Sequence, residues 1–333
     1  MKYCKLISVS AVALGLALSS ANAAEVKLNF GHFMSPKHPM HRGVFVPLVK
    51  KVKEASNGEI NIKIFDSGKL GKGPVQQYKR IKEGAFDLGF GVLVYTPTLF
   101  PKTMLAGKPG VGSSAEAVAR QIWNVYSAHL QDEFGEAKLL GLWANWPAVL
   151  ITKKPVRTPA DIKGQIIRTS SAFDAPQIKA WGGVPEQISV TQTYDAFQKG
   201  TVDAVFIAPA ALYRPWNLHE PGNYVTVGMK SPASIFYLMA NKDSWAKLSK
   251  KHQEVLENAT GQEFSINASK VWGKADAAAF EKLKTQKGIE VINLTADQAA
   301  AFDKITDQVV NSEVDKAQSQ GIPAREIFGK LTN

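Results

Sequence analysis

The chain has 333 residues, a formal net charge of +11 and one cysteine, and its length is sufficient for two lobes with separate hydrophobic cores. The basic residues are scattered, and the largest cluster is Lys50-Lys51 with Lys53, so we expect no nucleic-acid partner. The charge is either plain solvated surface or a field that attracts small anions.

The first 23 residues have the pattern of an export signal. Lys2 and Lys5 precede an apolar run over residues 6–18, and residues 21–23 form an Ala-Asn-Ala cleavage site. The run is too short to span a bilayer, which takes about 20 residues. Cleavage would remove Cys4, so the mature chain has no disulfide and no thiol chemistry. We therefore expect a periplasmic protein that does not itself span the membrane.

The first part of the mature chain alternates between strand and helix patterns. Strands are expected at 26–32, 60–64 and 85–94, and helices at 38–56 and 75–83. Pro47 lies inside the first of these helices, where it favours a kink. Strand, helix, strand, helix, strand is the order of a doubly wound α/β lobe.

One phrase of the sequence occurs twice. Residues 81–90 and 197–206 each combine a helix end, Gly-x-x-Asp and an apolar strand. The glycine suits the turn that ends a helix, and Asp87 and Asp203 can hydrogen-bond the turning backbone. Two copies at equivalent joints indicate two lobes of similar build with a cleft between them, as in proteins that close on a ligand by a hinge motion.

The remaining elements fit a chain that crosses between lobes. A helix is expected at 115–135 and a strand at 138–143, and the chain should cross to the second lobe near 145–147 and return near 235–241. A long helical stretch is expected from about 250 to 283, a short strand at 289–292, and helices over 296–301 and 305–314 after a cap at Thr295.

A short strand that carries an arginine follows one helical turn. Pro159 and Asp161 suit the start of that turn, Gly164 suits its exit, and Ile166-Ile167 indicates the strand. Arg168 then lies at the carboxyl end, where ligands bind in open α/β sheets. Its guanidinium is a planar fork that matches a carboxylate. The alternative from spacing alone is an ordinary surface salt bridge.

The segment Asp161-Ile-Lys-Gly-Gln-Ile-Ile-Arg168, with the later Tyr194-Asp-Ala-Phe-Gln-Lys-Gly-Thr-Val-Asp203, resembles the extracytoplasmic solute-binding proteins of TRAP transporters, the DctP-like family. The resemblance extends over essentially the whole mature chain. It implies an α/β, two-lobed periplasmic binding protein fold with hinge strands and a long connecting helix. It also implies that Arg168 binds the carboxylate of the substrate and that the partner is a TRAP-type membrane permease.

The resemblance and the element pattern together divide the chain. We predict a signal peptide at 1–23, lobe I at 24–147 with 236–273 returning to it, and lobe II at 148–235 with 274–333 returning to it.

The cleft joints depart from the pattern of family members that bind sugar acids. Their polar partners are replaced here by Phe33, Val92, Ala148 and Ile207, and an apolar pocket with one charged anchor suits a hydrophobic carboxylate. Taken singly, most aromatic residues near the cleft are also typical of a core. The candidate substrate-binding residues are Arg168, Phe33, Trp146, Ser171, Phe173, Val92, Ile207, Phe206 and Tyr213, with Lys72 of a Gly-Lys-Gly turn as a secondary candidate for a charge contact.

Catalytic and metal-binding patterns are missing from the sequence. His38 and His41 are three residues apart without a third ligand nearby, which is typical of a helix start rather than a metal site. We expect no catalytic residue, metal or cofactor, and hypothesise that the protein captures an aromatic or apolar monocarboxylate for a permease. A periplasmic ligand sensor for a signalling receptor and a secreted α/β enzyme are the alternatives.

Overall fold

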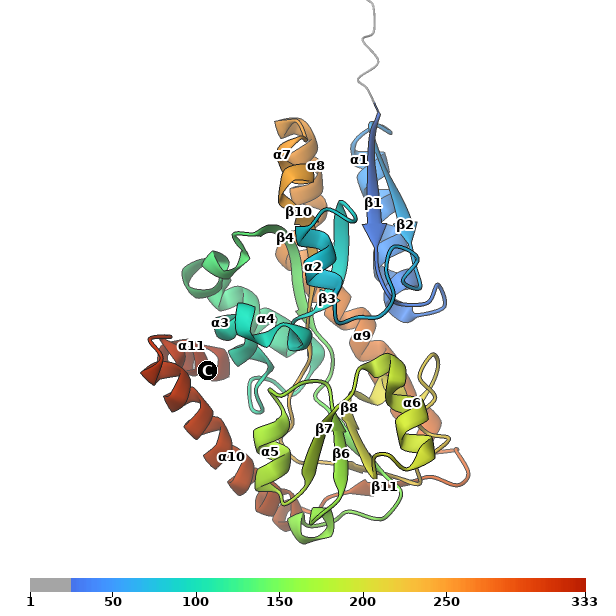
Figure 1. The fold of residues 1–333 in the computed structure, drawn as a ribbon, viewed down its shortest axis with the longest axis vertical. Coiled ribbons are helices and arrows are strands. Elements are labelled where there is room, and N and C mark those ends of the chain that lie inside the picture. Colours follow the sequence, from blue (N-terminus) through green and yellow to red (C-terminus); the bar gives the residue numbers. More distant parts are fainter. Residues whose placement is uncertain (1–24) are drawn as a thin grey trace, which may run out of the picture.

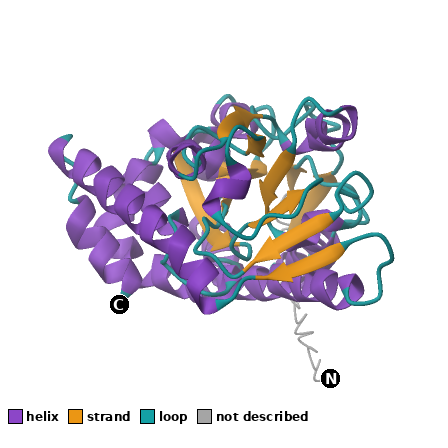
Figure 2. Ribbon diagram, turned by 90° about the horizontal axis from the view of Figure 1, so that it is seen from below, coloured by secondary structure: helices purple, strands orange, loops and turns teal. Residues whose placement is uncertain are grey.

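The computed structural model describes residues 25–333 and contains two mixed sheets with helices packed around them (Figures 1 and 2). The predicted signal peptide, residues 1–23, lies outside the described residues. None of the described helices has the length and hydropathy of a membrane span. Two sheets joined by a long helix confirm the predicted α/β fold with two lobes.

The first sheet has five strands in the order β2-β1-β3-β10-β4. β1, β2 and β3 are parallel, and β10 runs antiparallel to both β3 and β4. Each residue of β3 and β10 is buried, because helices cover both faces there. The strand bounds are Val26–Gly31 for β1, Ile60–Phe65 for β2, Leu88–Val92 for β3, Ala137–Ala144 for β4 and Ile235–Asn241 for β10.

The helices of the first lobe follow the predicted order with changed bounds. The helix expected at 38–56 consists of a π-helical turn, His41–Phe45, and α1, Val46–Ala55. Pro47 lies in the first turn of α1, where its missing N–H is not needed. The remaining bounds are α2 Gln77–Lys82, η2 Leu93–Tyr95, η3 Pro97–Leu99, α3 Pro101–Met104, η4 Leu105–Gly107, α4 Ala115–Val125, η5 Tyr126–Leu130 and η6 Gln131–Phe134.

The second sheet has six strands in the order β11-β9-β5-β8-β6-β7. β6 is parallel to β7 and β8, whereas β5 is antiparallel to β8 and β9. The strand bounds are β5 Val149–Thr152, β6 Ile166–Thr169, β7 Val184–Gln187, β8 Ala204–Ile207, β9 Tyr224–Val227 and β11 Glu290–Asn293. The helices are η7 Pro159–Ile162, α5 Ala175–Ala180, α6 Val190–Lys199 and η8 Pro209–Leu212.

The repeated Gly-x-x-Asp phrase forms the same joint in both lobes. A carboxylate oxygen of Asp87 accepts a hydrogen bond from the Asn29 backbone N–H at 2.7 Å, and Asp203 accepts one from Ile166 at 2.8 Å. The backbone N–H of each aspartate also donates to the backbone carbonyl of its partner, Asn29 for Asp87 and Ile166 for Asp203. The glycines of the two phrases have positive φ angles of 73° and 77°. The aspartate therefore attaches the new strand to a neighbouring strand in each lobe. The repeat predicted equivalent joints, but it placed the hydrogen bond of the aspartate on the turning backbone and not on a neighbouring strand.

The helix α9, Gly261–Leu283, passes from the first sheet to the second (Figure 1). It follows α7, Lys242–Ala246, and α8, Lys250–Ala259, which ends at Thr260. β4 is an edge strand, and polar side chains of α9 accept the backbone N–H groups that this edge leaves free. Ser265 accepts from Leu142 at 2.9 Å, and Ser269 accepts from Ala144 at 3.0 Å.

Asp276 of α9 continues this row of acceptors where the chain crosses between lobes. Its carboxylate accepts from the N–H of Trp146 at 3.2 Å and from the N–H of Ala210, in η8, at 2.8 Å. The side chain is fully buried. Burial raises the pKa of Asp276 to about 7, and the two backbone N–H groups oppose this rise. One carboxyl group thus connects the long helix, the crossing segment and the second lobe.

The C-terminal residues extend over both lobes. α10, Ala296–Ser319, is one continuous helix that packs on α5, and α11, Ala324–Thr332, packs on α4 of the first lobe (Figure 1). Ala324, Ile327 and Leu331 join the core of the first lobe. We expected residues 274–333 to return to lobe II, whereas this apolar face brings their last part to lobe I. The division of the chain into lobes is otherwise still a prediction.

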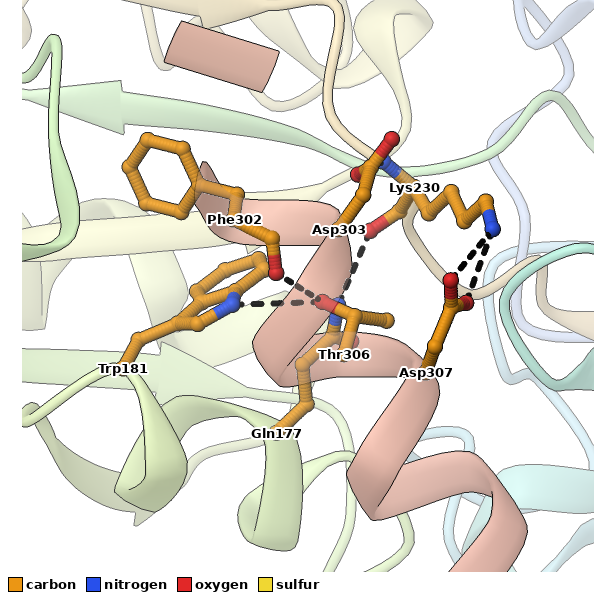
Figure 3. Close-up of polar contacts among 7 residues, drawn as sticks. All are labelled: Gln177, Trp181, Lys230, Phe302, Asp303, Thr306 and Asp307. Atoms are coloured by element: carbon orange, nitrogen blue, oxygen red, sulfur yellow. Dashed lines mark hydrogen bonds and ion pairs between the residues drawn. The ribbon is translucent and has the colours of Figure 1, made fainter. Parts of the chain in front are cut away.

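A buried hydroxyl joins α10 to α5 (Figure 3). Thr306 accepts hydrogen bonds from the Gln177 amide at 3.0 Å and the Trp181 indole at 3.2 Å, and it donates to the Phe302 carbonyl at 3.0 Å. Nearby, Lys230 donates its backbone N–H to Asp303 at 2.6 Å. These contacts attach α10 to the second lobe before it continues to the first.

We expect Thr306→Val to lower the free energy of unfolding by about 1–3 kcal/mol, because the buried Trp181 indole N–H loses its acceptor. Urea unfolding followed by circular dichroism measures the change. Thr306→Ser, which keeps the hydroxyl, is the control and should lose less. Unchanged stability in Thr306→Val together with a loss in Thr306→Ser would mean that packing of the methyl group, and not the hydroxyl, is responsible.

The raised pKa of Asp276 predicts a pH dependence of stability. Between about pH 4 and about pH 7 the folded chain retains a proton that the unfolded chain releases, so this group's contribution to the free energy of unfolding falls as the pH rises through that window. Urea unfolding of the wild type and of Asp276→Asn at pH 5 and pH 8 measures it. We expect the decline to be steeper in the wild type, and equal slopes would contradict the assignment.

Candidate functional site

A cavity of about 300 Å³ lies between the two lobes. Residues of both sheets and of α9 line it, and apolar side chains dominate the lining. From the first lobe and α9 these are Phe33, Met34, Val92, Val94, Phe236 and Trp272, and from the second lobe Ile207, Ala208, Ala211, Tyr213 and Trp216. The volume is at the small end of the range for ligand sites, which suits a small guest.

Strand ends place these residues at the cavity. Phe33 follows β1, Val92 ends β3 and Ile207 ends β8. The carboxyl ends of parallel strands from the two sheets therefore meet at the cavity, which is the usual ligand position in α/β proteins. The ring of Phe33 lines the cavity and stacks on the buried ring of Phe90, with 5.5 Å between ring centroids, so this part of the lining is packed against the core of the first lobe.

Arg168 lies behind the opposite wall of the cavity. The predicted helical turn before it is present, with Asp161 accepting from the N–H of Thr158 at 2.8 Å and Gly164 at a φ of 75°. β6 then carries Arg168 to a fully buried position between β7 and β8. Ser170 and Ile207, beside it on the chain and on β8, line the cavity.

The guanidinium of Arg168 is only partly satisfied by the protein. Its Nε donates to the carbonyl of Ile188 at 2.9 Å, and Nη1 donates to that of Phe206 at 3.5 Å. Nη2 has no hydrogen-bond partner among the described residues. The side chain has no exposed surface, so the alternative of an ordinary surface salt bridge is wrong. A buried positive group with a spare donor is suited to an anionic guest.

Burial and nearby groups act in opposite directions on the charges around Arg168. Burial lowers the pKa of Arg168, whereas Tyr95 and Asp174 favour its charged form. Burial also raises the pKa of Asp174, which the Thr169 hydroxyl, at 2.8 Å, and the Arg168 charge oppose. An arginine remains protonated at neutral pH because its ordinary pKa is far above 7. The site thus keeps a positive charge with an incomplete set of partners.

The other predicted site residues divide into three groups. Phe33, Val92, Ile207 and Tyr213 line the cavity. Trp146 and Phe206 border a neighbouring pocket of about 20 Å³, and Phe173 borders another of the same size, below the Lys108 ammonium group that lies 4.3 Å from its ring centroid. Ser171 and Lys72 lie outside all three pockets. The Ser171 hydroxyl accepts from the Phe173 N–H at 3.1 Å, and Lys72 is an exposed turn residue.

The sequence patterns missed several lining residues. Tyr95, Asn145 and Ser170 bring polar groups to the cavity, and their positions just beyond the predicted joints at 92, 143 and 168 were the available signal. His38 also lines the cavity, with its ring 5.5 Å from that of Trp272. Burial lowers the pKa of His38 to about 4, so it is neutral at pH 7.

The histidines near β1 do not form a metal site among the described residues. His32 and His41 share a hydrogen bond of 3.1 Å, and no group of three metal-ligating side chains is present in residues 25–333. Arg214 and Lys282 are the charged residues that line the cavity, and Arg168 lies buried on β6 beside the lining residue Ser170.

Comparisons with known proteins identify the family of the chain. Residues 30–317 match the DctP family model, described as bacterial extracellular solute-binding protein, family 7. The C4-dicarboxylate-binding periplasmic protein DctP of Rhodobacter capsulatus is 24% identical over 334 residues, which cover 95% of each chain.

Two solved structures have the same fold. A TRAP solute-binding protein of Rhodoferax ferrireducens, in complex with copurified benzoate, is 25% identical with a TM-score of 0.86, over 92% of this chain and 96% of that one. A TRAP periplasmic solute-binding protein of Bordetella bronchiseptica, with bound (R)- and (S)-mandelate, is 23% identical with a TM-score of 0.83, over 92% and 98%. The chain therefore belongs to the DctP family of bacterial extracellular solute-binding proteins, and it is a solute-binding component of a TRAP transporter rather than an enzyme.

Proposed function

We propose that the protein captures an aromatic or apolar monocarboxylate in the interlobe cavity and delivers it to a TRAP-type permease in the membrane. The observation that carries the proposal concerns a fully buried Arg168 beside an apolar cavity, whose Nη2 has no hydrogen-bond partner in the described part of the chain, residues 25–333. The carboxylate accepts from this guanidinium, and the charge-assisted bond replaces the contacts that the protein itself leaves open.

Closure of the lobes follows from the burial of the anchor. Because Arg168 has no exposed surface in this arrangement, the acid reaches it while the lobes are apart. Closure then excludes water from the ion pair and strengthens it. The closed protein docks on the permease. The predicted signal at 1–23 accounts for export to the periplasm.

The body of the guest lies against the apolar lining. Phe33, Val92, Ile207 and Tyr213 are the proposed contacts, and an aromatic ring there gains about 0.5–1.5 kcal/mol beyond its burial from ring–ring geometry. Trp146 and Phe206 border a small pocket that shares Ser170 and Ile207 with the cavity, whereas the pocket beside Phe173 shares no lining residue with it. The benzoate and mandelate bound by the two similar structures support this class of guest.

A small dicarboxylate is the second candidate. Arg214 and Lys282 line the same cavity, and the relative from Rhodobacter capsulatus is named for C4-dicarboxylates. Both side chains are exposed, however, and the Lys282 ammonium group lies 3.9 Å from the ring centroid of Tyr213. Solvated cations at the rim hold a second carboxylate more weakly than a buried one does, so the monocarboxylate is favoured.

A thermal-shift screen of organic acids tests the class of guest. We expect benzoate, phenylacetate and mandelate to raise the melting temperature, since a ligand that binds only the folded state stabilises it. Succinate and galacturonate, which have no apolar body, should raise it less. A shift with succinate alone would favour the dicarboxylate, and a shift with galacturonate alone would contradict the apolar pocket.

Substitution of Arg168 tests the anchor. We expect Arg168→Ala to weaken binding of the acid found in the screen by about 2–5 kcal/mol, because the charge pair is lost from a buried site. Arg168→Lys should also bind weakly, since an ammonium group cannot reproduce the planar fork. Isothermal titration measures both, and circular dichroism checks the fold.

The matched control is Arg157→Ala, another arginine of the second lobe, which pairs with Glu290 at the surface at 2.9 Å. Its affinity should equal that of the wild type. Wild-type affinity in Arg168→Ala would remove Arg168 from the site.

A further inference from the structure

Tyr95 brings a hydroxyl group from the first lobe to the anchor of the second. It ends η2, directly after β3, and its side chain lines the cavity together with Ser170 and Val190 of the second lobe. The hydroxyl lies near enough to the Arg168 guanidinium to favour its charged form. Tyr95 is thus a first-lobe side chain beside the arginine that the second lobe supplies.

One short segment of the second lobe holds both side chains in place. The carbonyl of Ile188 accepts from Arg168 Nε at 2.9 Å, and the N–H of Val190 donates to the Tyr95 hydroxyl oxygen at 3.2 Å. Because residues 188 and 190 flank Ser189, the N-cap of α6, the two side chains have a fixed relation when the lobes are closed.

The chemistry of these contacts leaves two donors free. The Val190 N–H can only donate, so the Tyr95 oxygen acts as an acceptor toward it, and the tyrosine's own hydrogen needs an acceptor elsewhere. Among the described residues the Tyr95 hydroxyl takes part in one hydrogen bond, the one from Val190. Arg168 Nη2 likewise has no partner there. Two adjacent donors without acceptors match the two oxygens of a carboxylate.

We propose that Tyr95 is a second donor to the bound carboxylate, so that one acid group is held by both lobes. The inference rests on the proposed function, because it concerns the same carboxylate that Arg168 binds. Arg168 comes from the second sheet and Tyr95 from η2, which follows β3 of the first sheet, so an acid bound to both stabilises the closed arrangement over the open one. The ligand thereby has the differential contact that a closing motion requires.

Titration of Tyr95→Phe with benzoate and, separately, with succinate tests the inference. The variant keeps the ring in the cavity wall and removes only the hydroxyl. For each acid that the wild type binds, we expect about a ten-fold or larger loss of affinity, the size for a hydrogen bond to a charged group. Tyr126→Phe is the matched control, since this tyrosine lies outside the cavity beside α4, and its affinity should be that of the wild type.

Small-angle X-ray scattering distinguishes a Tyr95 hydroxyl that donates to the ligand from one that only joins the two lobes through its hydrogen bond with Val190. If Tyr95 donates to the ligand, ligand-free Tyr95→Phe should have the same radius of gyration as ligand-free wild type. Saturating acid should then lower the radius of gyration less in the variant than in the wild type. Wild-type affinity in Tyr95→Phe would overturn the inference and leave the Arg168 anchor intact. A ligand-free variant that is more open, with an affinity loss equal for both acids, would also overturn it. Failure of wild type to bind either acid would instead overturn the proposed function itself.

Discussion

The structure depends on a buried positive charge that the protein only partly pairs. Removing a guanidinium from water costs several kcal/mol unless hydrogen bonds and opposite charges compensate. Two carbonyls accept from Arg168, and the half-buried Asp174 favours its charge, but Nη2 has no acceptor within residues 25–333. The acid proposed above supplies the acceptor that this group lacks. A buried, charged donor without an acceptor is the physical reason that a binding protein can hold an acid without any covalent chemistry.

The surroundings of the charge determine which acids fit. The cavity wall is built from aromatic and aliphatic groups at strand ends, with Phe33 stacked on Phe90 in the first lobe and Ile207 opposite in the second. Such walls favour a guest that buries apolar surface, because they offer few partners to hydroxyl groups. One charge and an apolar enclosure together define the proposed class of substrate.

The long helix α9 makes the two lobes one unit. Its serines accept the free N–H groups of the edge strand β4, and Asp276 accepts from both the crossing segment and η8. These acceptors form a row along one face of the helix, so the edge that β4 leaves unpaired is covered rather than exposed. The C-terminal helices add a second connection, through Thr306 to α5 and through α11 to α4.

Local patterns predicted the elements that depend on nearby residues. The Gly-x-x-Asp joints, the turn before β6 and the alternation of β1 and β2 all appear in the structure, because turn glycines, capping aspartates and apolar periodicity act within a few positions. The bounds at the first helix changed, since a π-helical turn places Pro47 at the start of α1. The last helix also packs on lobe I, which periodicity alone does not specify.

The sequence by itself determined the fold class, the two similar joints and the arginine at a strand end, since these follow from spacing along the chain. Only the tertiary structure decided that Phe33, Val92, Ile207 and Tyr213 share one cavity, and that Ser171 and Lys72 lie outside it. It also placed Tyr95 beside Arg168, 73 residues further along the chain. The physical reason is that such contacts depend on how two separately folded lobes meet, and no local pattern encodes a distance between them.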